Sequence, residues 1–241
     1  MKYVVRAALV ILISVPLPAF AVETVKSPII NEGDLQLEHI GKYQEDSNPK
    51  RDDQKEYDLG IAYGVTDRWR TKLQTEYEDK GSGNFHYKDF NWENIVSLTG
   101  NNSPVPTAFY LDLLAANRSD SSHSALTGFI FLKELGPTVN TANLFLRREF
   151  GDTASDKTSF VYRFQSRYHL YSYFDPGFEL WGDTNKQDDF KNQSLKIGPG
   201  AFGKFEIAGA KNFGYELVYL FGATPASHDG TLKWRLTYDF P

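Results

Sequence analysis

The stretch Thr231-Leu-Lys-Trp-Arg-Leu-Thr-Tyr-Asp-Phe-Pro241 alternates between apolar and polar residues at almost every position. A period of two is typical of a β-strand, because successive side chains of a strand point to opposite faces. One face of this strand would carry Leu232, Trp234, Leu236, Tyr238 and Phe240. The other face would carry Thr231, Lys233, Arg235, Thr237 and Asp239. The stretch therefore predicts a strand with one apolar and one charged face.

The other end of the chain predicts export. Lys2 and Arg6 precede a short apolar run over residues 7–15, and Pro18-Ala-Phe-Ala21 has the small residues of a cleavage site. This order is typical of a secretory signal peptide, which we assign to residues 1–21. No cysteine follows the site, so we do not expect a lipoprotein.

Composition favours a membrane barrel over a helical membrane protein. Among 241 residues, 15% are aromatic and none is cysteine, while the mean hydropathy is −0.45. A helical membrane protein is not that polar, but a barrel can be, since only alternate residues face lipid. The net charge of −5 is spread along the chain, so we expect no nucleic-acid partner.

About twelve segments along the chain have the length and alternation of a tilted membrane strand. Long polar connections alternate with short ones, and only residues 99–106 are long where a short turn is expected. We therefore predict an all-β fold, a closed antiparallel transmembrane β-barrel of about 12 strands, over residues 34–241. Residues 22–33 are assigned to a periplasmic N-terminal segment. A soluble lipocalin or sandwich is the alternative, but large apolar residues opposite charged ones on nearly every strand favour lipid outside and water inside.

Aromatic residues near the expected strand ends predict girdles at the two membrane interfaces. We expect five interfacial anchors: Trp69, Tyr168, Trp234, Tyr238 and Phe240.

The tight turn at residues 66–68 sets the register of one hairpin, so Asp58 should face Glu76 and Glu56 should face Glu78. The next hairpin should bring Asp89 close to Glu76. We therefore expect an acidic lumen wall of Glu56, Asp58, Glu76, Glu78 and Asp89. Its neutralising partners would come from nearby cations, namely Lys42, Lys55, Arg70 and Lys72.

Strand eight of a twelve-stranded ring lies across from strand two, which predicts a basic lumen wall of Arg147, Arg163 and Arg167. Strand spacing and tilt leave a gap of roughly 10 Å between side chains. The two walls could orient small polar or zwitterionic solutes in a transverse field. Alternatively, the charges form a salt-bridged interior that only stiffens the barrel.

No catalytic arrangement stands out. None of the five histidines belongs to an H-E-x-x-H or H-x-x-x-H motif. Ser166 and His169 are three apart on one strand, so they point to opposite faces and cannot form a dyad. We expect no catalytic residues, no metal and no cofactor.

Several segments together resemble a family of small proteobacterial outer-membrane barrels described as porin-like or transporter-like. The matching segments are Tyr63-Gly-Val-Thr-Asp-Arg-Trp69, Thr141-Ala-Asn-Leu-Phe-Leu146, Gln165-Ser-Arg-Tyr168, Gly198-Pro-Gly-Ala-Phe-Gly-Lys204 and residues 215–240. The resemblance implies a barrel in the outer membrane and carries neither a substrate nor catalytic residues.

We accordingly expect a porin-like channel for small polar or charged solutes in the outer membrane of a Gram-negative cell. Two alternatives are a structural or surface-interaction barrel with a plugged lumen and a lipid-modifying enzyme of that membrane. Expected partners are outer-membrane lipid, lipopolysaccharide and the barrel assembly machinery, which would contact the C-terminal strand.

Overall fold

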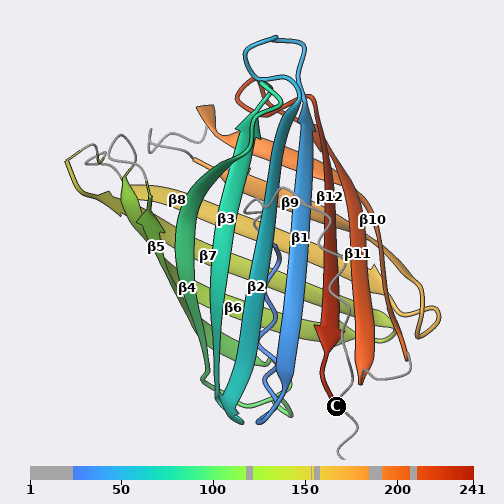
Figure 1. Ribbon diagram of the computed structural model, residues 1–241. Coiled ribbons are helices and arrows are strands. Elements are labelled where there is room, and N and C mark those ends of the chain that lie inside the picture. The colour runs from blue at the N-terminus through green and yellow to red at the C-terminus, as the bar shows by residue number, and fades with distance from the viewer. Residues whose placement is uncertain (1–23, 118–121, 153, 155–157, 185–191, 207–210) are drawn as a thin grey trace, which may run out of the picture.

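The computed structural model describes residues 24–117, 122–152, 154, 158–184, 192–206 and 211–241. The predicted signal peptide therefore lies outside the described residues. Twelve antiparallel strands within these ranges close into one barrel, in which each strand pairs with its neighbours in sequence and β1 pairs with β12 (Figure 1). The strands are β1 (Leu35–Glu45), β2 (Gln54–Thr66), β3 (Trp69–Lys80), β4 (His86–Ser97), β5 (Thr107–Ala116), β6 (His123–Leu135), β7 (Thr138–Phe150), β8 (Thr158–Tyr168), β9 (Asp175–Asp183), β10 (Ser194–Phe205), β11 (Asn212–Gly222) and β12 (Gly230–Asp239). The predicted fold class and strand number are confirmed. No helix among the described residues is long and apolar enough to cross a membrane.

The connections fall into two groups at opposite ends of the barrel. Residues 67–68, 136–137 and 169–174 join strands at the end where β1 begins and β12 finishes, which we call the termini end. Longer connections such as 46–53 and 223–229 lie at the opposite end, which we call the loop end. Residues 98–106 are again the long exception at the termini end.

Alternation decides which side chains face outward. Along β2, Leu59, Ile61 and Tyr63 are exposed, whereas the alternate residues Asp58, Gly60 and Ala62 are buried in the interior. The same pattern holds on β8, where the inward residues include Val161, Arg163 and Gln165. The barrel is therefore apolar outside and largely polar inside, as a membrane barrel requires.

The seam between β1 and β12 closes the barrel through ten Cα pairs, from Gln36 opposite Asp239 to Glu45 opposite Gly230. At its middle, Trp234 lies opposite Gly41, and a Cβ on Gly41 would overlap the indole ring. Tyr57 packs against the same indole, with ring centroids 5.4 Å apart. Glycine is therefore needed at residue 41 so that the tryptophan can cover the seam.

The Gly198-Pro-Gly200 stretch lies within β10. Pairing with β11 lapses between Ile197 and Gly200, but the register on either side of the gap is the same. Pro199 has no N–H to donate, so the ladder loses hydrogen bonds there without gaining a residue. Pairing with β11 is therefore interrupted locally, without a bulge.

Candidate functional site

A chain of alternating positive and negative side chains runs around half of the lumen. We call it the ion-pair belt, and it connects β4, β3, β1, β12, β11 and β9. Each link joins one cation to one carboxylate: Lys26–Glu93 (2.5 Å), Lys72–Glu93 (3.3 Å), Lys72–Glu38 (2.6 Å), Arg235–Glu38 (2.5 Å), Arg235–Glu216 (3.1 Å), Lys233–Glu216 (3.5 Å) and Lys233–Glu179 (2.8 Å).

The belt is buried deep in the barrel. Side-chain exposure is 2% at Lys72, 1% at Glu38 and 0% at both Lys233 and Glu179. Charges with so little exposure are tolerated only where each has close partners of opposite sign. Alternation supplies these partners, because Lys72, Glu38 and Arg235 each contact two ions of the opposite charge.

The other half of the lumen, on β4 to β8, carries an apolar cluster beside inward polar residues such as Asn143 and Arg163. On these strands the cluster consists of the buried side chains of Ile95, Ala108, Tyr110, Leu126, Ile130, Phe145 and Val161. Ile30, which precedes β1, belongs to this cluster and is 1% exposed. Burying an isoleucine side chain contributes roughly 1.5–3 kcal/mol, so Ile30 attaches the N-terminal segment to this wall.

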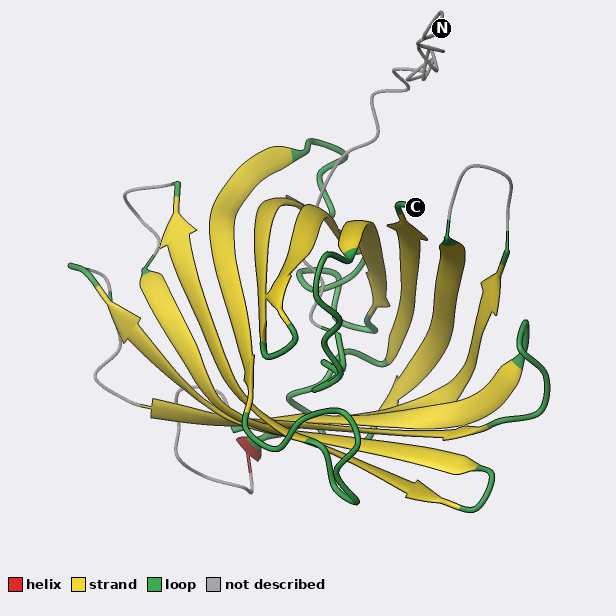
Figure 2. Cartoon of the chain, turned by 90° about the horizontal axis from the view of Figure 1, so that it is seen from below, coloured by secondary structure: helices red, strands yellow, loops and turns green. Residues whose placement is uncertain are grey.

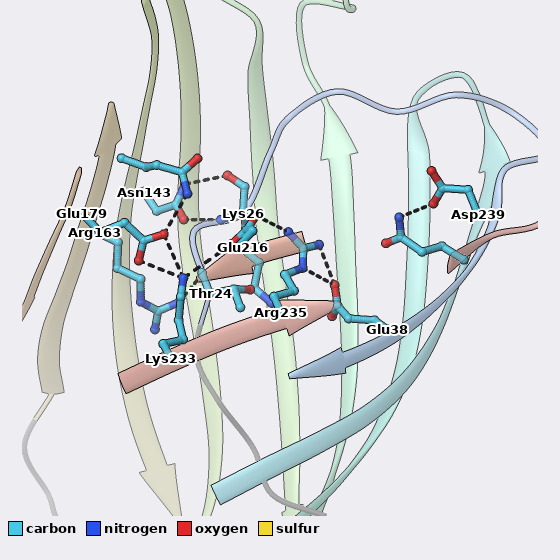
Figure 3. Close-up of polar contacts among 12 residues, drawn as sticks. Thr24, Lys26, Glu38, Asn143, Arg163, Glu179, Glu216, Lys233, Arg235 and Asp239 are labelled. Carbon is cyan, nitrogen blue, oxygen red and sulfur yellow. Dashed lines mark hydrogen bonds and ion pairs between the residues drawn. The ribbon is translucent and has the colours of Figure 1, made fainter. Parts of the chain in front are cut away.

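Residues 24–30, which we call the N-terminal segment, lie inside the ring of strands (Figure 2). The Lys26 N–H donates to Asn143 Oδ1 (2.7 Å), and Asn143 Nδ2 donates back to the Lys26 carbonyl (2.9 Å). Arg163 Nη1 donates to the Thr24 carbonyl (2.9 Å), as Figure 3 shows. The Lys26 ammonium group completes the ion-pair belt at Glu93. Strands β4, β7 and β8 therefore jointly hold the N-terminal segment in place.

Residues 22–33 were expected in the periplasm, and nothing in their sequence indicates that residues 24–30 enter the lumen. Asn101, in the long connection 98–106, also holds it. The Ile30 N–H donates to Asn101 Oδ1 (3.1 Å), and Asn101 Nδ2 donates to the Ile30 carbonyl (2.6 Å). The unusual length of this connection was visible in the sequence and is the one signal that could have pointed to the contact.

Two cavities meet at the N-terminal segment. A cavity of about 970 Å³ opens toward the termini end and is lined by residues such as Arg167, Glu216 and Asp239. A second cavity of about 580 Å³ opens toward the loop end. Lys26 and Glu93 line both cavities, so their ion pair stands between them.

The five residues of the expected acidic wall all line the loop-end cavity. Glu56 lies opposite Glu78, and Asp58 and Asp89 each lie opposite Glu76. Their neutralisation differs in part from our expectation. Lys42 does pair with Glu56 (2.6 Å). In contrast, Lys55 pairs with Asp53 (2.7 Å), while Arg70 and Lys72 pair with Glu93 of the belt at 3.6 and 3.3 Å.

Lys88 is the cation that the sequence reasoning missed in this wall. Its ammonium group pairs with Glu76 and lies 4.0 Å from Glu78. Lys88 is the extra residue of β4 at the point where its register with β3 shifts, between Glu76 and Tyr77. Hydrophobic alternation does not predict such an irregularity.

The three residues of the expected basic wall do not share one cavity. Arg147 and Arg163 line the loop-end cavity, whereas Arg167 lines the termini-end cavity. Arg147 pairs with Asp183 (2.7 Å), and the Arg163 guanidinium lies over the rings of Phe145 and Trp181. The Arg167 guanidinium lies over Phe202, 5.7 Å from its centroid.

Four of the five expected anchors lie at the termini end, on the outer face: Trp69, Tyr168, Tyr238 and Phe240. Trp234 differs, because it lies near the middle of β12 and covers Gly41. Alternation indicates which face a tryptophan occupies but not its depth in the membrane, which explains the difference. Among the described residues there is no group of three or more His, Cys, Asp or Glu side chains that could hold a metal ion.

Comparison with known proteins supports the architecture. No family model matches the chain, and no curated protein is similar enough to be matched. Among solved structures, the COG4313 outer membrane channel from Pseudomonas putida F1 is 11% identical, with a TM-score of 0.62 over 91% of this chain and 100% of that chain. The KdgM porin (9% identity, TM-score 0.56, 86% and 98% covered) and the NanC porin (11%, 0.54, 85% and 99%) are also similar. At such identities the likeness shows the fold alone, which is that of outer-membrane porin-like barrels.

The ion-pair belt predicts a large stability loss when one member is neutralised. Glu38→Gln leaves Lys72 and Arg235 each short of a buried partner and should destabilise the barrel by about 3–5 kcal/mol. Urea unfolding in detergent micelles, followed by tryptophan fluorescence, would measure the loss. Lys80→Gln is the control, because Lys80 pairs with Glu78 at 3.0 Å but is 71% exposed, and its loss should stay below about 1 kcal/mol. Equal losses for the two variants would contradict a buried belt.

His228 predicts acid sensitivity at the loop end. Burial, followed by the positive charges of Lys196, Arg51 and Lys42, lowers the pKa of His228 to about 4, while Asp46 acts in the opposite direction. The neutral ring accepts a hydrogen bond at Nδ1 from Gln44 Nε2 (2.9 Å), and its Nε2 lies 3.3 Å from Gln54 Oε1.

Because this pKa is lower in the folded barrel than in the unfolded chain, His228 contributes its full stability above about pH 6.5 and loses it as the pH falls through about 4. Between pH 7 and pH 4, the wild type should therefore lose more stability than His228→Gln, which cannot titrate. Urea midpoints of both proteins at the two pH values test this. A parallel loss in both proteins would show that His228 is not responsible.

Proposed function

We propose that this protein is a narrow outer-membrane channel for small polar and charged solutes. The observation that carries the proposal is the pair of polar, charged cavities of about 970 and 580 Å³, which open toward opposite ends of a barrel with an apolar outer face. Charged side chains and water-filled spaces inside a barrel are what a solute path requires. The similarity in fold to porins and to an outer membrane channel supports the same proposal.

The solutes that suit this lumen are small. The belt and the N-terminal segment fill its middle, so only the cavities on either side have space for a guest. The acidic wall on β2 to β4 lies across the loop-end cavity from Arg147 and Arg163. A solute with a positive and a negative group can bind the two sides at once, which favours polar zwitterions over uncharged sugars.

A second candidate is a structural or surface-interaction barrel with a plugged lumen. One observation favours it, namely that the N-terminal segment stands between the two cavities. Under this reading the segment stiffens the barrel permanently, and no solute crosses. The two candidates differ in whether ions pass at all.

Conductance in planar bilayers separates the two candidates. The refolded full-length protein should give small conductance steps, because the segment narrows the lumen. A Lys26→Ala, Ile30→Ala variant lacks the belt contact and the apolar anchor of the segment while the strands are unchanged, so its steps should be several-fold larger. If both proteins are silent, the channel proposal is wrong and the plugged barrel is favoured.

Ion selectivity tests whether the lumen charges act on passing solutes. Arg163→Gln combined with Arg167→Gln removes two positive charges from the lumen and should shift the reversal potential in a salt gradient toward cations. Lys133→Gln is the matched control, because Lys133 is exposed on β6 and lines neither cavity. Unchanged selectivity in the double variant would contradict a role for these arginines in conduction.

A further inference from the structure

The wall of the lumen binds the backbone of the N-terminal segment through paired hydrogen bonds, as a receptor binds a peptide. Asn143 on β7 and Asn101 in the β4–β5 connection each form two hydrogen bonds with the backbone of a single residue, Lys26 and Ile30 respectively. A carboxamide carries a donor and an acceptor side by side, so it can satisfy the N–H and the carbonyl of one residue together. The two amides thus bind the backbone of the segment at Lys26 and Ile30, which are four positions apart, from different parts of the wall.

Side chains of the segment are recognised separately. The Lys26 ammonium group contacts Glu93 (2.5 Å) and lies 6.0 Å from the centroid of the Tyr110 ring. Ile30 is buried in the apolar cluster on β4 to β8. A cation with an acidic partner, and a branched aliphatic residue four positions later in an apolar pocket, together specify a class of peptide.

The segment is joined to the barrel by a short hinge. Gly33 has a φ of +80°, a left-handed conformation that lets the chain turn back from β1 into the lumen. Its N–H donates to the Gly64 carbonyl (2.8 Å), and Asp34 pairs with Lys211 at 2.7 Å. Asn31 and Glu32, just before the hinge, are exposed. Residues 31–33 are thus the covalent tether between the barrel and residues 24–30, whose own contacts with the wall are non-covalent. This tether is accessible at the termini end.

We propose that the lumen contains a binding site for short peptides with a lysine followed four positions later by a branched aliphatic residue, and that residues 24–30 are its tethered, exchangeable occupant. Release of the segment joins the two cavities, and binding of a free peptide separates them again. The effect on conduction rests on the proposed channel function, whereas peptide binding does not.

The test cuts the tether of the full-length protein after folding. A protease recognition sequence is inserted between Asn31 and Glu32, the protein is folded with its segment in place, cleaved and washed. A synthetic peptide of residues 24–30, with blocked ends and a fluorophore at its C-terminal end, is then titrated in detergent micelles and followed by fluorescence anisotropy. We expect saturable binding to the cut protein and at least tenfold weaker binding to the uncut protein, whose site is occupied.

Two matched pairs make the result specific. A peptide with Lys26→Met should bind at least tenfold more weakly than the native peptide. Cut protein with Asn143→Ala should also bind more weakly, whereas Asn140→Ala should bind normally, since Asn140 on the same strand donates to Lys133 and Thr138 and not to the segment. Absence of binding to the cut protein, equal binding to the uncut protein, or equal binding of the Lys26→Met peptide would each overturn the proposal.

Conductance distinguishes this proposal from the function on which it rests. Cleavage and washing should raise the conductance, and peptide added at the termini side should reduce it again. Peptide binding without any conductance would preserve the binding site and contradict the channel. A conductance that neither cleavage nor peptide changes would preserve the channel and contradict the exchangeable occupant.

Discussion

The ion-pair belt is the constraint on which the rest of the interior depends. Buried ions are stable only beside partners of opposite sign, so every strand that contributes a charge must bring it to the right depth. Lys72–Glu38 spans β3 and β1, and Arg235–Glu38 spans the closing seam between β12 and β1. A register slip of one residue would turn these charges toward lipid, so the belt penalises misregistered closure of the barrel.

The belt also explains why the lumen has two unlike halves. It ends at Glu93 on β4, and an apolar cluster extends from Ile95 on the same strand to Val161 on β8. The N-terminal segment matches both halves, because Lys26 supplies the last cation of the belt and Ile30 packs against the apolar wall. Its position therefore follows from the chemistry of the two walls that it contacts.

Alternation along the strands was enough to predict the barrel, its twelve strands, the two kinds of connection and the pairing of Glu56 with Glu78. These features depend on a period of two and on one tight turn, both of which are local. The belt, the role of Lys88 and the depth of Trp234 depend on how strands tilt and shift relative to one another, which alternation does not encode. The N-terminal segment was missed for a different reason, because it has no regular structure and its partners are single asparagines far away in sequence.

The connection of residues 98–106 departs from the short turns that otherwise join strands at the termini end. A barrel needs only short turns at its termini end, and residues 67–68 and 136–137 satisfy that need. Residues 98–106 exceed it, and their Asn101 forms the double hydrogen bond to Ile30. Closing a longer loop costs little free energy, so such a loop is an inexpensive way to carry an amide to the mouth of the lumen. The irregular turn is thus best understood as part of the site that holds the N-terminal segment.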